Sequence, residues 1–333
     1  MSRRPGHVTT GPYAPPVPHT TLPVTSADGA RLHAEVHGPK DAPAVVLAHG
    51  WTCSTAFWAP VVRELAADHR VVLYDQRGHG RSPAAGPAGH STSALADDFV
   101  AVLDATLRPG ERAVVGGHSM GGMTIMAAAE RPQLRERAAA ALLCSTGSAD
   151  LAAESRVFPL RSPQGRRRAH RLLLHARAPL GPVSPLARSA LRYATMGPGA
   201  TAEQIEACAR IVHACPPGVR ARWGRVLSGL ELTGGAAGLA LPTAVIAGTA
   251  DRLTPLVHAR RLASVLPDCR GLTELPGLGH MTPIEDPAAV AGRLRALVED
   301  HLRAAGAGAG SGAGEDAAAQ VPRSARQKKE KTA

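Results

Sequence analysis

A serine lies in a glycine-rich turn between an expected strand and an expected helix. The run is Gly117-His118-Ser119-Met120-Gly121, which fits the pattern G-x-S-x-G. Small and β-branched residues precede it at 113–116, and residues 120–129 can continue as a helix. Such a turn forces the serine into a strained backbone conformation, and the two flanking glycines let neighbouring backbone approach. The pattern therefore indicates a nucleophilic hydroxyl beside the N–H groups of a helix start.

A serine hydroxyl needs a general base, and the base needs a carboxylate that orients it. The chain has 15 histidines, so position must select the base. Catalytic side chains on a parallel sheet follow the carboxyl ends of strands. His280 follows the last expected strand, and Asp251 follows the buried run 244–248. The sequence thus predicts that Ser119, Asp251 and His280 act together.

The elements that position these residues alternate between β-rich runs and amphipathic helices. This alternation predicts a mostly parallel sheet with helices on both faces. Strands are expected near 32–36, 45–48, 71–74, 113–116, 139–144, 242–248 and 271–275. Helices are expected from Ser54, which can cap the segment up to 65, from Ser91 to 107, and near 120–129, 255–266 and 290–302.

The stretch 147–240, which we call the cap, interrupts this rhythm. It holds helical patterns at 166–177, 184–195, 201–213 and 218–229 but no convincing strand. A helical block between two strands of one sheet is expected to cover the carboxyl edge of that sheet. The chain would then divide into a flexible leader (1–20), an α/β core (21–146 and 241–303), the cap, and a low-complexity basic tail (304–333).

Five motifs together resemble the α/β-hydrolase superfamily, in its serine-nucleophile branch of esterases and lipases. They are His49-Gly50-Trp51, the DQRGHGRS loop at 75–82, GHSMGG at 117–122, Gly248-Thr249-Ala250-Asp251 and Gly279-His280. The resemblance covers roughly residues 25–303. It implies the α/β-hydrolase fold, with Ser119 as nucleophile, His280 as general base and then acid, and Asp251 as the orienting acid.

The resemblance also implies roles for residues around the nucleophile. The main-chain N–H groups of Trp51 and Met120 would form the oxyanion hole. The 75–82 loop would be structural. Asp150, soon after the strand that precedes the cap, is the alternative acid, because some relatives place the acid there. Four further residues would support the site structurally: His49, Gly50, Gly117 and Gly121.

These features predict a serine hydrolase that acts on a carboxylic ester or related acyl substrate through an acyl-enzyme on Ser119. Alternatives that use the same triad are an acyltransferase, a cofactor-free haloperoxidase-like enzyme and a C–C-bond hydrolase. A ligand-binding member of the fold without activity is the alternative outside enzyme chemistry. No cofactor or metal is expected, because the sequence has no dinucleotide fingerprint and no metal-ligand cluster, and it indicates no particular oligomeric state.

The formal net charge of +11 is unevenly distributed. Counting charged side chains gives +2 for 1–20, −1 for 21–146, +8 for the cap, 0 for 241–303 and +2 for 304–333. The basic charge comes from 34 Arg and 4 Lys, the bias of a GC-rich genome. No nucleic-acid motif occurs, so no nucleic-acid partner is expected. The run Arg166-Arg167-Arg168 indicates a solvated basic face, or alternatively contact with a lipidic or anionic substrate or with a membrane surface.

The cysteines and residues 1–20 indicate the cellular compartment of the protein. Five cysteines at unrelated spacings, with no C-x-x-C pair, predict neither a zinc site nor a disulfide framework. Residues 1–20 have two arginines but no apolar stretch typical of a secretory signal. No segment approaches the roughly 20 apolar residues that span a bilayer. A cytoplasmic location is therefore expected.

Overall fold

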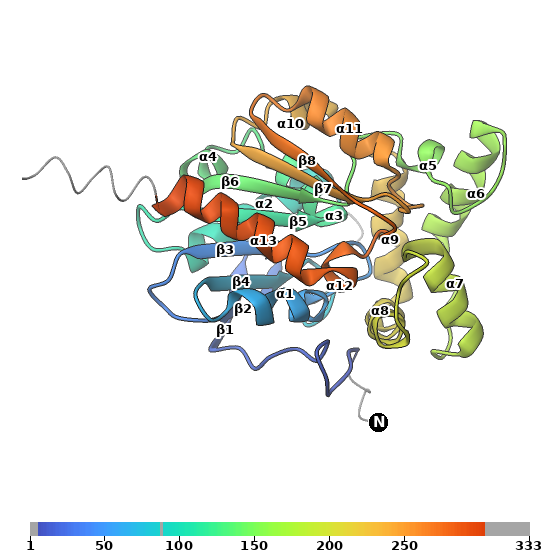
Figure 1. Cartoon of the computed structure of the whole chain (residues 1–333), viewed down its shortest axis with the longest axis horizontal. Coiled ribbons are helices and arrows are strands. Elements are labelled where there is room, and N and C mark those ends of the chain that lie inside the picture. Colours follow the sequence, from blue (N-terminus) through green and yellow to red (C-terminus); the bar gives the residue numbers. More distant parts are fainter. Residues whose placement is uncertain (1–5, 87–88, 304–333) are drawn as a thin grey trace, which may run out of the picture.

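Eight strands form a single sheet at the centre of the molecule (Figure 1). The structure is a computed structural model that describes residues 6–86 and 89–303. The strand order is β1-β2-β4-β3-β5-β6-β7-β8; the β1–β2 and β2–β4 pairs are antiparallel, and the pairs from β4–β3 to β7–β8 are parallel. The bounds are β1 Thr20–Thr25, β2 Arg31–His37, β3 Ala44–Ala48, β4 Arg70–Asp75, β5 Ala113–His118, β6 Ala138–Cys144, β7 Thr243–Gly248 and β8 Cys269–Leu275. The expected mostly parallel sheet is therefore confirmed.

Helices connect most of these strands. They are α1 Ala59–Leu65, α2 Thr92–Thr106, α3 Met120–Ala127, α4 Pro132–Arg137, α5 Leu151–Glu154, α6 Pro163–His175, α7 Pro185–Thr195, α8 Ala202–Ala214, α9 Pro217–Ser228, α10 Thr233–Ala237, α11 Leu256–Val265, α12 Thr282–Glu285 and α13 Pro287–Val298. Side chains explain several amino-terminal boundaries. Ser91, Ser162 and Ser184 each accept a hydrogen bond from a backbone N–H of the first turn of α2, α6 and α7.

The central strands are covered on both faces. Every residue of β3, β5, β6 and β7 is buried, as expected for strands between two layers of helices. Successive residues of β3 point to opposite layers. Val45 and Leu47 pack in the cluster that includes α1 and α13, whereas Val46 and Ala48 pack in the cluster that includes α2 and α3. The buried run that predicted this strand therefore reflects two apolar cores.

The cap contains helices α5–α10, all between β6 and β7 in the chain. Helices α6–α9 match the four helical patterns in the sequence within a few residues, and they gather beyond one end of the sheet (Figure 1). Helix α10 packs instead against the core helices α3 and α11. We therefore interpret α6–α9 as the part of the cap that covers the edge of the sheet.

Two expectations about the amino-terminal region differ from the structure. The described part of the leader is attached to the core, because Arg63 of α1 donates hydrogen bonds to the carbonyls of Pro12 and Ala14. Ser54 makes no capping hydrogen bond; the backbone N–H of Thr55 donates instead to Asp75, at 2.8 Å. The segment after Ser54 is a 3₁₀ turn, Thr55–Trp58, before α1. The tail at 304–333 lies outside the described residues.

Candidate active site

Ser119 stands alone between β5 and α3, in the conformation that the G-x-S-x-G turn predicts. Its φ is 52° and its ψ is −117°, a region that non-glycine residues rarely adopt. The turn is possible because neighbouring backbone passes close by. A Cβ on Gly117 would collide with the carbonyl of Gly121, and a Cβ on Gly121 would collide with the carbonyl of Ala48. The flanking glycines are therefore required by backbone contact.

His280 is oriented by a buried carboxylate. Its Nδ1 lies 2.8 Å from Oδ2 of Asp251, whose side chain has no exposed surface. The other oxygen of Asp251 accepts hydrogen bonds from the backbone N–H groups of Leu253 and Thr254. The hydroxyl of Thr254 donates to Oδ2 at 2.8 Å. Nδ1 of His280 therefore carries the proton of this pair, and Nε2 is the nitrogen that can accept one.

The loop that carries His280 is bound from three sides. The backbone N–H of His280 donates to the carbonyl of Thr195 at the end of α7. The backbone carbonyl of His280 accepts a hydrogen bond from Nε2 of His118 at 2.8 Å. Burial lowers the pKa of His118 well below its usual range, which keeps this ring neutral. Glu285 accepts hydrogen bonds from the N–H groups on either side of His280, those of Gly279 and Met281. The loop therefore ties His280 to both the core and the cap.

The loop after β3, residues 49–53, lies directly beside the serine; we call it the oxyanion loop. A Cβ on Gly50 would come within 2.8 Å of Nδ1 of His118 and 3.2 Å of the Cβ of Ser119. His49 is fully buried, and its ring accepts a hydrogen bond from the N–H of Gln76 at 3.0 Å. Trp51 follows in this loop, and Met120 begins α3, where first-turn N–H groups have no partner within the helix. The two residues whose amides are expected to form the oxyanion hole therefore lie on the two segments next to Ser119.

The 75–82 loop makes internal contacts rather than opening to the serine. Asp75 accepts hydrogen bonds from the N–H groups of Thr55 and Arg81, and burial raises its pKa to about 6. The guanidinium of Arg77 is buried and forms an ion pair with Asp98 at 2.5 Å. These contacts tie the 75–82 loop to the 3₁₀ turn at 55–58 and to α2, which agrees with the structural role expected for this loop.

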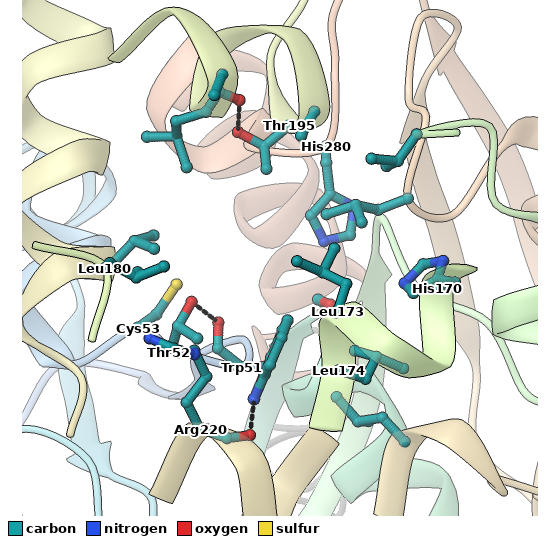
Figure 2. Close-up of a pocket in the computed structure, with 18 of the residues that line it drawn as sticks. Trp51, Thr52, Cys53, His170, Leu173, Leu174, Leu180, Thr195, Arg220 and His280 are labelled. Carbon is teal, nitrogen blue, oxygen red and sulfur yellow. Dashed lines mark hydrogen bonds between the residues drawn. The ribbon is translucent and has the colours of Figure 1, made fainter. Parts of the chain in front are cut away.

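A cavity of about 690 Å³ opens between the sheet edge and the cap, and Ser119 and His280 both line it. Figure 2 shows His280 pointing into this cavity. Most of its wall is apolar. The apolar lining includes Trp51, Met123, Leu151, Val157, Phe158, Leu173, Leu174, Leu180, Leu191, Val212, Leu227, Leu253 and Met281. The polar lining includes Thr52, His118, His170, Tyr193, Thr195, His213, Arg220 and Thr254, and no Asp or Glu among the described residues lines it. The chamber thus fits a mainly apolar molecule next to the serine.

The structure separates the alternative acid from His280. Asp150 is half exposed and forms ion pairs with Arg167 at 3.5 Å and Arg261 at 3.6 Å. The arginine run of the cap is also engaged elsewhere, because Arg166 donates to the carbonyls of Ala153 and residues 160–161. Neither Asp150 nor the run 166–168 lines the cavity.

Some cavity residues were not found from the sequence. His170 belongs to the same helix as the run 166–168, but it is buried and lines the cavity, and burial lowers its pKa to about 4. Thr254 was missed, although a hydroxyl three residues after Asp251 is a common local partner of a carboxylate. Arg220 was also missed, because only packing of the cap brings it to the cavity.

The described residues contain no group of three or more His, Cys, Asp or Glu side chains arranged to hold a metal ion. The five cysteines, all within the described ranges, are unpaired, and four of them are buried. No helix of residues 6–86 and 89–303 has the length and apolar character needed to cross a bilayer.

Comparison with known proteins decides the family. A family model described as the alpha/beta hydrolase family matches residues 45–293. The chain belongs to the alpha/beta hydrolase family. The match spans the oxyanion loop, Ser119, Asp251, His280 and the cap, so it confirms the α/β-hydrolase fold and the resemblance seen in the motifs. It also supports hydrolase activity at the level of the enzyme class.

Relatives and solved structures agree with this assignment. A protein of Variovorax paradoxus (strain S110) named "Putative carbamate hydrolase RutD" is 35% identical over 262 residues, which cover 77% of this chain and 92% of that protein. The fold is similar to that of a thermophilic esterase from Thermogutta terrifontis, with 24% identity, a TM-score of 0.68 and coverage of 84% and 98% of the two chains. An enol-lactonase from Burkholderia xenovorans LB400 has 26% identity and a TM-score of 0.64 over 84% of this chain and all of its own.

Proposed function

We propose that the protein is a serine hydrolase that cleaves a carboxylic ester or related acyl substrate through an acyl-enzyme on Ser119. One observation carries the proposal. A serine in a strained turn and a histidine bonded to a buried carboxylate line the same apolar cavity. A strained residue that opens to a cavity beside an oriented base is typical of an activated nucleophile.

The first half of the reaction forms the acyl-enzyme. Oγ of Ser119 attacks the carbonyl carbon while Nε2 of His280 accepts the hydroxyl proton. Negative charge develops on the carbonyl oxygen, and the N–H groups of Trp51 and Met120 donate to it. The tetrahedral intermediate collapses when His280 returns the proton to the leaving oxygen, which departs as an alcohol. Asp251 keeps the proton on Nδ1 throughout, so Nε2 remains the exchanging nitrogen.

The second half releases the acid. Water takes the place of the alcohol, and Nε2 of His280 accepts its proton as the oxygen attacks the acyl carbon. The same two N–H groups stabilise the second oxyanion, and His280 then protonates Oγ of Ser119. An alcohol or amine in place of water would complete an acyl transfer. Product analysis with and without such acceptors therefore separates a hydrolase from an acyltransferase.

A carbamate is the second candidate for the bond that is cleaved. It is favoured by the relative named "Putative carbamate hydrolase RutD", which matches over most of both chains. A carbamate carbonyl can be attacked by the same serine, and the intermediate would then be a carbamoyl-enzyme. Comparing p-nitrophenyl esters with p-nitrophenyl N-alkyl carbamates of equal size tests which acyl group turns over faster.

A fluorophosphonate probe tests the nucleophile directly. We expect covalent labelling of the wild-type protein and none of Ser119→Ala. Ser145→Ala is the matched control, since Ser145 also has a positive φ, of 45°, but is buried and bonds to Thr282 outside the cavity. The control should be labelled like the wild type. Equal labelling of wild type and Ser119→Ala would refute the proposal.

A further inference from the structure

Arg220 of α9 places a buried positive charge at the wall of the cavity. The residue is only 5% exposed and lines the same cavity as Ser119. Its Nη2 donates hydrogen bonds to the main-chain carbonyls of Ala176 and Ala178. A guanidinium has five N–H groups, so three remain beyond these two bonds. No carboxylate of the described residues forms an ion pair with it.

The other buried arginines are treated differently by the fold. Three arginines are buried among the described residues: Arg70, Arg77 and Arg220. Arg70 pairs with Glu111 at 2.6 Å, and Arg77 pairs with Asp98 at 2.5 Å. Arg220 alone of these three has only neutral carbonyl partners. Removing a charge from water without a counter-charge is costly, so residues of this kind are usually paired with an anion.

The backbone of Arg220 is fixed relative to the proposed oxyanion hole. Its carbonyl accepts a hydrogen bond at 3.0 Å from the indole Nε1 of Trp51, and the indole of Trp223, one turn further along α9, donates to the carbonyl of Arg77. Figure 2 shows Arg220 beside Thr52 on one side of the cavity, with His280 on the other side. An anion bound by Arg220 would therefore lie inside the chamber but away from the base.

We propose that Arg220 binds a carboxylate of the substrate, at a distance from the bond that is cleaved. The inference rests on the proposed function and narrows its substrate class to acyl compounds with an apolar body and one free carboxylate. The flat fork of a guanidinium matches a carboxylate, which can accept two N–H groups at once. The absence of Asp and Glu from the described lining leaves the substrate as the source of the counter-charge.

The test compares neutral and anionic substrates of matched shape. One pair carries the carboxylate on the acyl part. It compares mono-p-nitrophenyl glutarate with methyl p-nitrophenyl glutarate, in which the free carboxylate is methylated. The other pair carries it on the alcohol part: 4-carboxyphenyl pentanoate against its methyl ester. In the wild type we expect kcat/KM for the acid to exceed that of the neutral partner by roughly tenfold or more in at least one pair, mainly through KM. The pair that responds identifies which part of the substrate carries the carboxylate.

Variants then assign this preference to one residue. Arg220→Gln should lower the acid-to-neutral ratio of kcat/KM by roughly tenfold. Arg220→Lys should lower this ratio less, because lysine keeps the positive charge but lacks the planar guanidinium that donates to both carboxylate oxygens. Arg222→Gln is the control on the same helix; Arg222 donates to the carbonyl of Ala85 and does not line the cavity, so the ratio should stay unchanged. Circular dichroism checks folding.

Each negative outcome has a distinct meaning. If the wild type prefers neither acid, the inference fails even when no Arg220 variant folds. If Arg220→Gln lowers turnover of acid and neutral ester equally, Arg220 only braces the turn at 176–178, and the inference also fails. In both cases fluorophosphonate labelling of Ser119 would leave the proposed function standing. Loss of labelling in the wild type would instead remove the proposed function itself.

Discussion

Asp251 has both carboxylate oxygens fully engaged, and the arrangement determines which of its atoms faces His280. Oδ1 accepts two backbone N–H groups, those of Leu253 and Thr254. Oδ2 accepts from the Thr254 hydroxyl and from Nδ1 of His280. A side chain with four acceptor positions and no donor is therefore required. An amide of the same shape could satisfy the two backbone groups only with its oxygen, which would turn its NH₂ towards His280.

Asp251→Asn should consequently reverse the proton arrangement of His280. The amide would donate to Nδ1, so the proton would move to Nε2, which could then no longer accept the proton of Ser119. We expect kcat to fall by roughly 10³–10⁴-fold, with folding retained. The measurement is steady-state hydrolysis of a short p-nitrophenyl ester by the wild type and the variant.

The alternative acid provides the matched control. Asp150→Asn removes an exposed carboxylate whose partners are Arg167 and Arg261, so its turnover should stay within about twofold of the wild type. The opposite pattern, with Asp150→Asn inactive and Asp251→Asn active, would reassign the acid of the triad. It would also show that the histidine loop rearranges before catalysis.

At the scale of elements, the β5–α3 turn packs directly against the backbone at the end of β3 and the start of the oxyanion loop, because Gly121 has no side chain. Gly121 in the first turn of α3 lies against the end of β3, where an added Cβ would collide with the carbonyl of Ala48 and come within 2.9 Å of that of His49. These carbonyls belong to the residues three and two positions before Trp51. Any shift that accommodates a larger residue at Gly121 must therefore move one of the two loops that flank Ser119.

Replacing glycine by alanine in two different helices should change the free energy of unfolding in opposite directions. Gly121→Ala is expected to lower the free energy of unfolding by about 1–3 kcal/mol and to reduce activity, because backbone must move. Gly292→Ala in α13, where nothing lies within 4 Å of the added Cβ, should raise it by about 0.4–1 kcal/mol. Urea unfolding of both variants checks the two signs. Equal effects would mean that the β5–α3 turn tolerates a larger residue without moving.

The elements that could be predicted are those whose boundaries depend on local residues. The buried run 244–248 ends at a glycine, and the run 45–48 is followed by one two residues later, so these strands could be located from the sequence. Asp251 and His280 were selected because they follow expected strands. Strand β1 was missed, because it is an edge strand in which only Val24 is buried and Pro23 interrupts the pattern. Arg220 depends on packing between distant segments, which no local pattern records.

At the scale of the whole molecule, the positive charge is mostly remote from the reaction. The cap contains 13 arginines. Of these, Arg220 is the one that lines the cavity within the described residues. Exposed arginines act at long range and are screened by salt, whereas a buried guanidinium acts locally and is screened far less. The net charge therefore carries little information about the substrate, and a single buried arginine carries more.

The whole molecule also buries several neutral histidines. Four of the buried histidines have a strongly lowered pKa: His49, His79, His118 and His170. Burial lowers the pKa of His49 and of His170 to about 4 and that of His79 to about 3, and it lowers the pKa of His118 well below its usual range. In the unfolded chain each ring would titrate near pH 6.5. The folded state thus holds four rings neutral at a pH where the unfolded chain protonates them.

Stability should therefore fall steeply on mild acidification. A lowered histidine pKa gives a stabilisation that is complete above about pH 6.5 and is lost as the pH falls through the folded value. Asp75 has the opposite effect on stability, since burial raises its pKa to about 6. Its contribution to the free energy of unfolding increases as the pH falls over the same range. For these five groups alone, the four histidines gain about four protons on unfolding and Asp75 loses about one. The difference of about three protons corresponds to about 4 kcal/mol per pH unit between pH 6 and 5.

Urea unfolding at pH 7.5, 6.0, 5.5 and 5.0 measures this slope. His170→Leu removes one of the four rings and should reduce the slope by about one proton, or about 1.4 kcal/mol per pH unit, whereas His19→Leu at an exposed position should leave it unchanged. A free energy of unfolding that stays constant from pH 7.5 to 5.0 would contradict the burial of neutral rings. An unchanged slope in His170→Leu would mean that His170 reaches water through the cavity and titrates freely, so that the cap opens in solution.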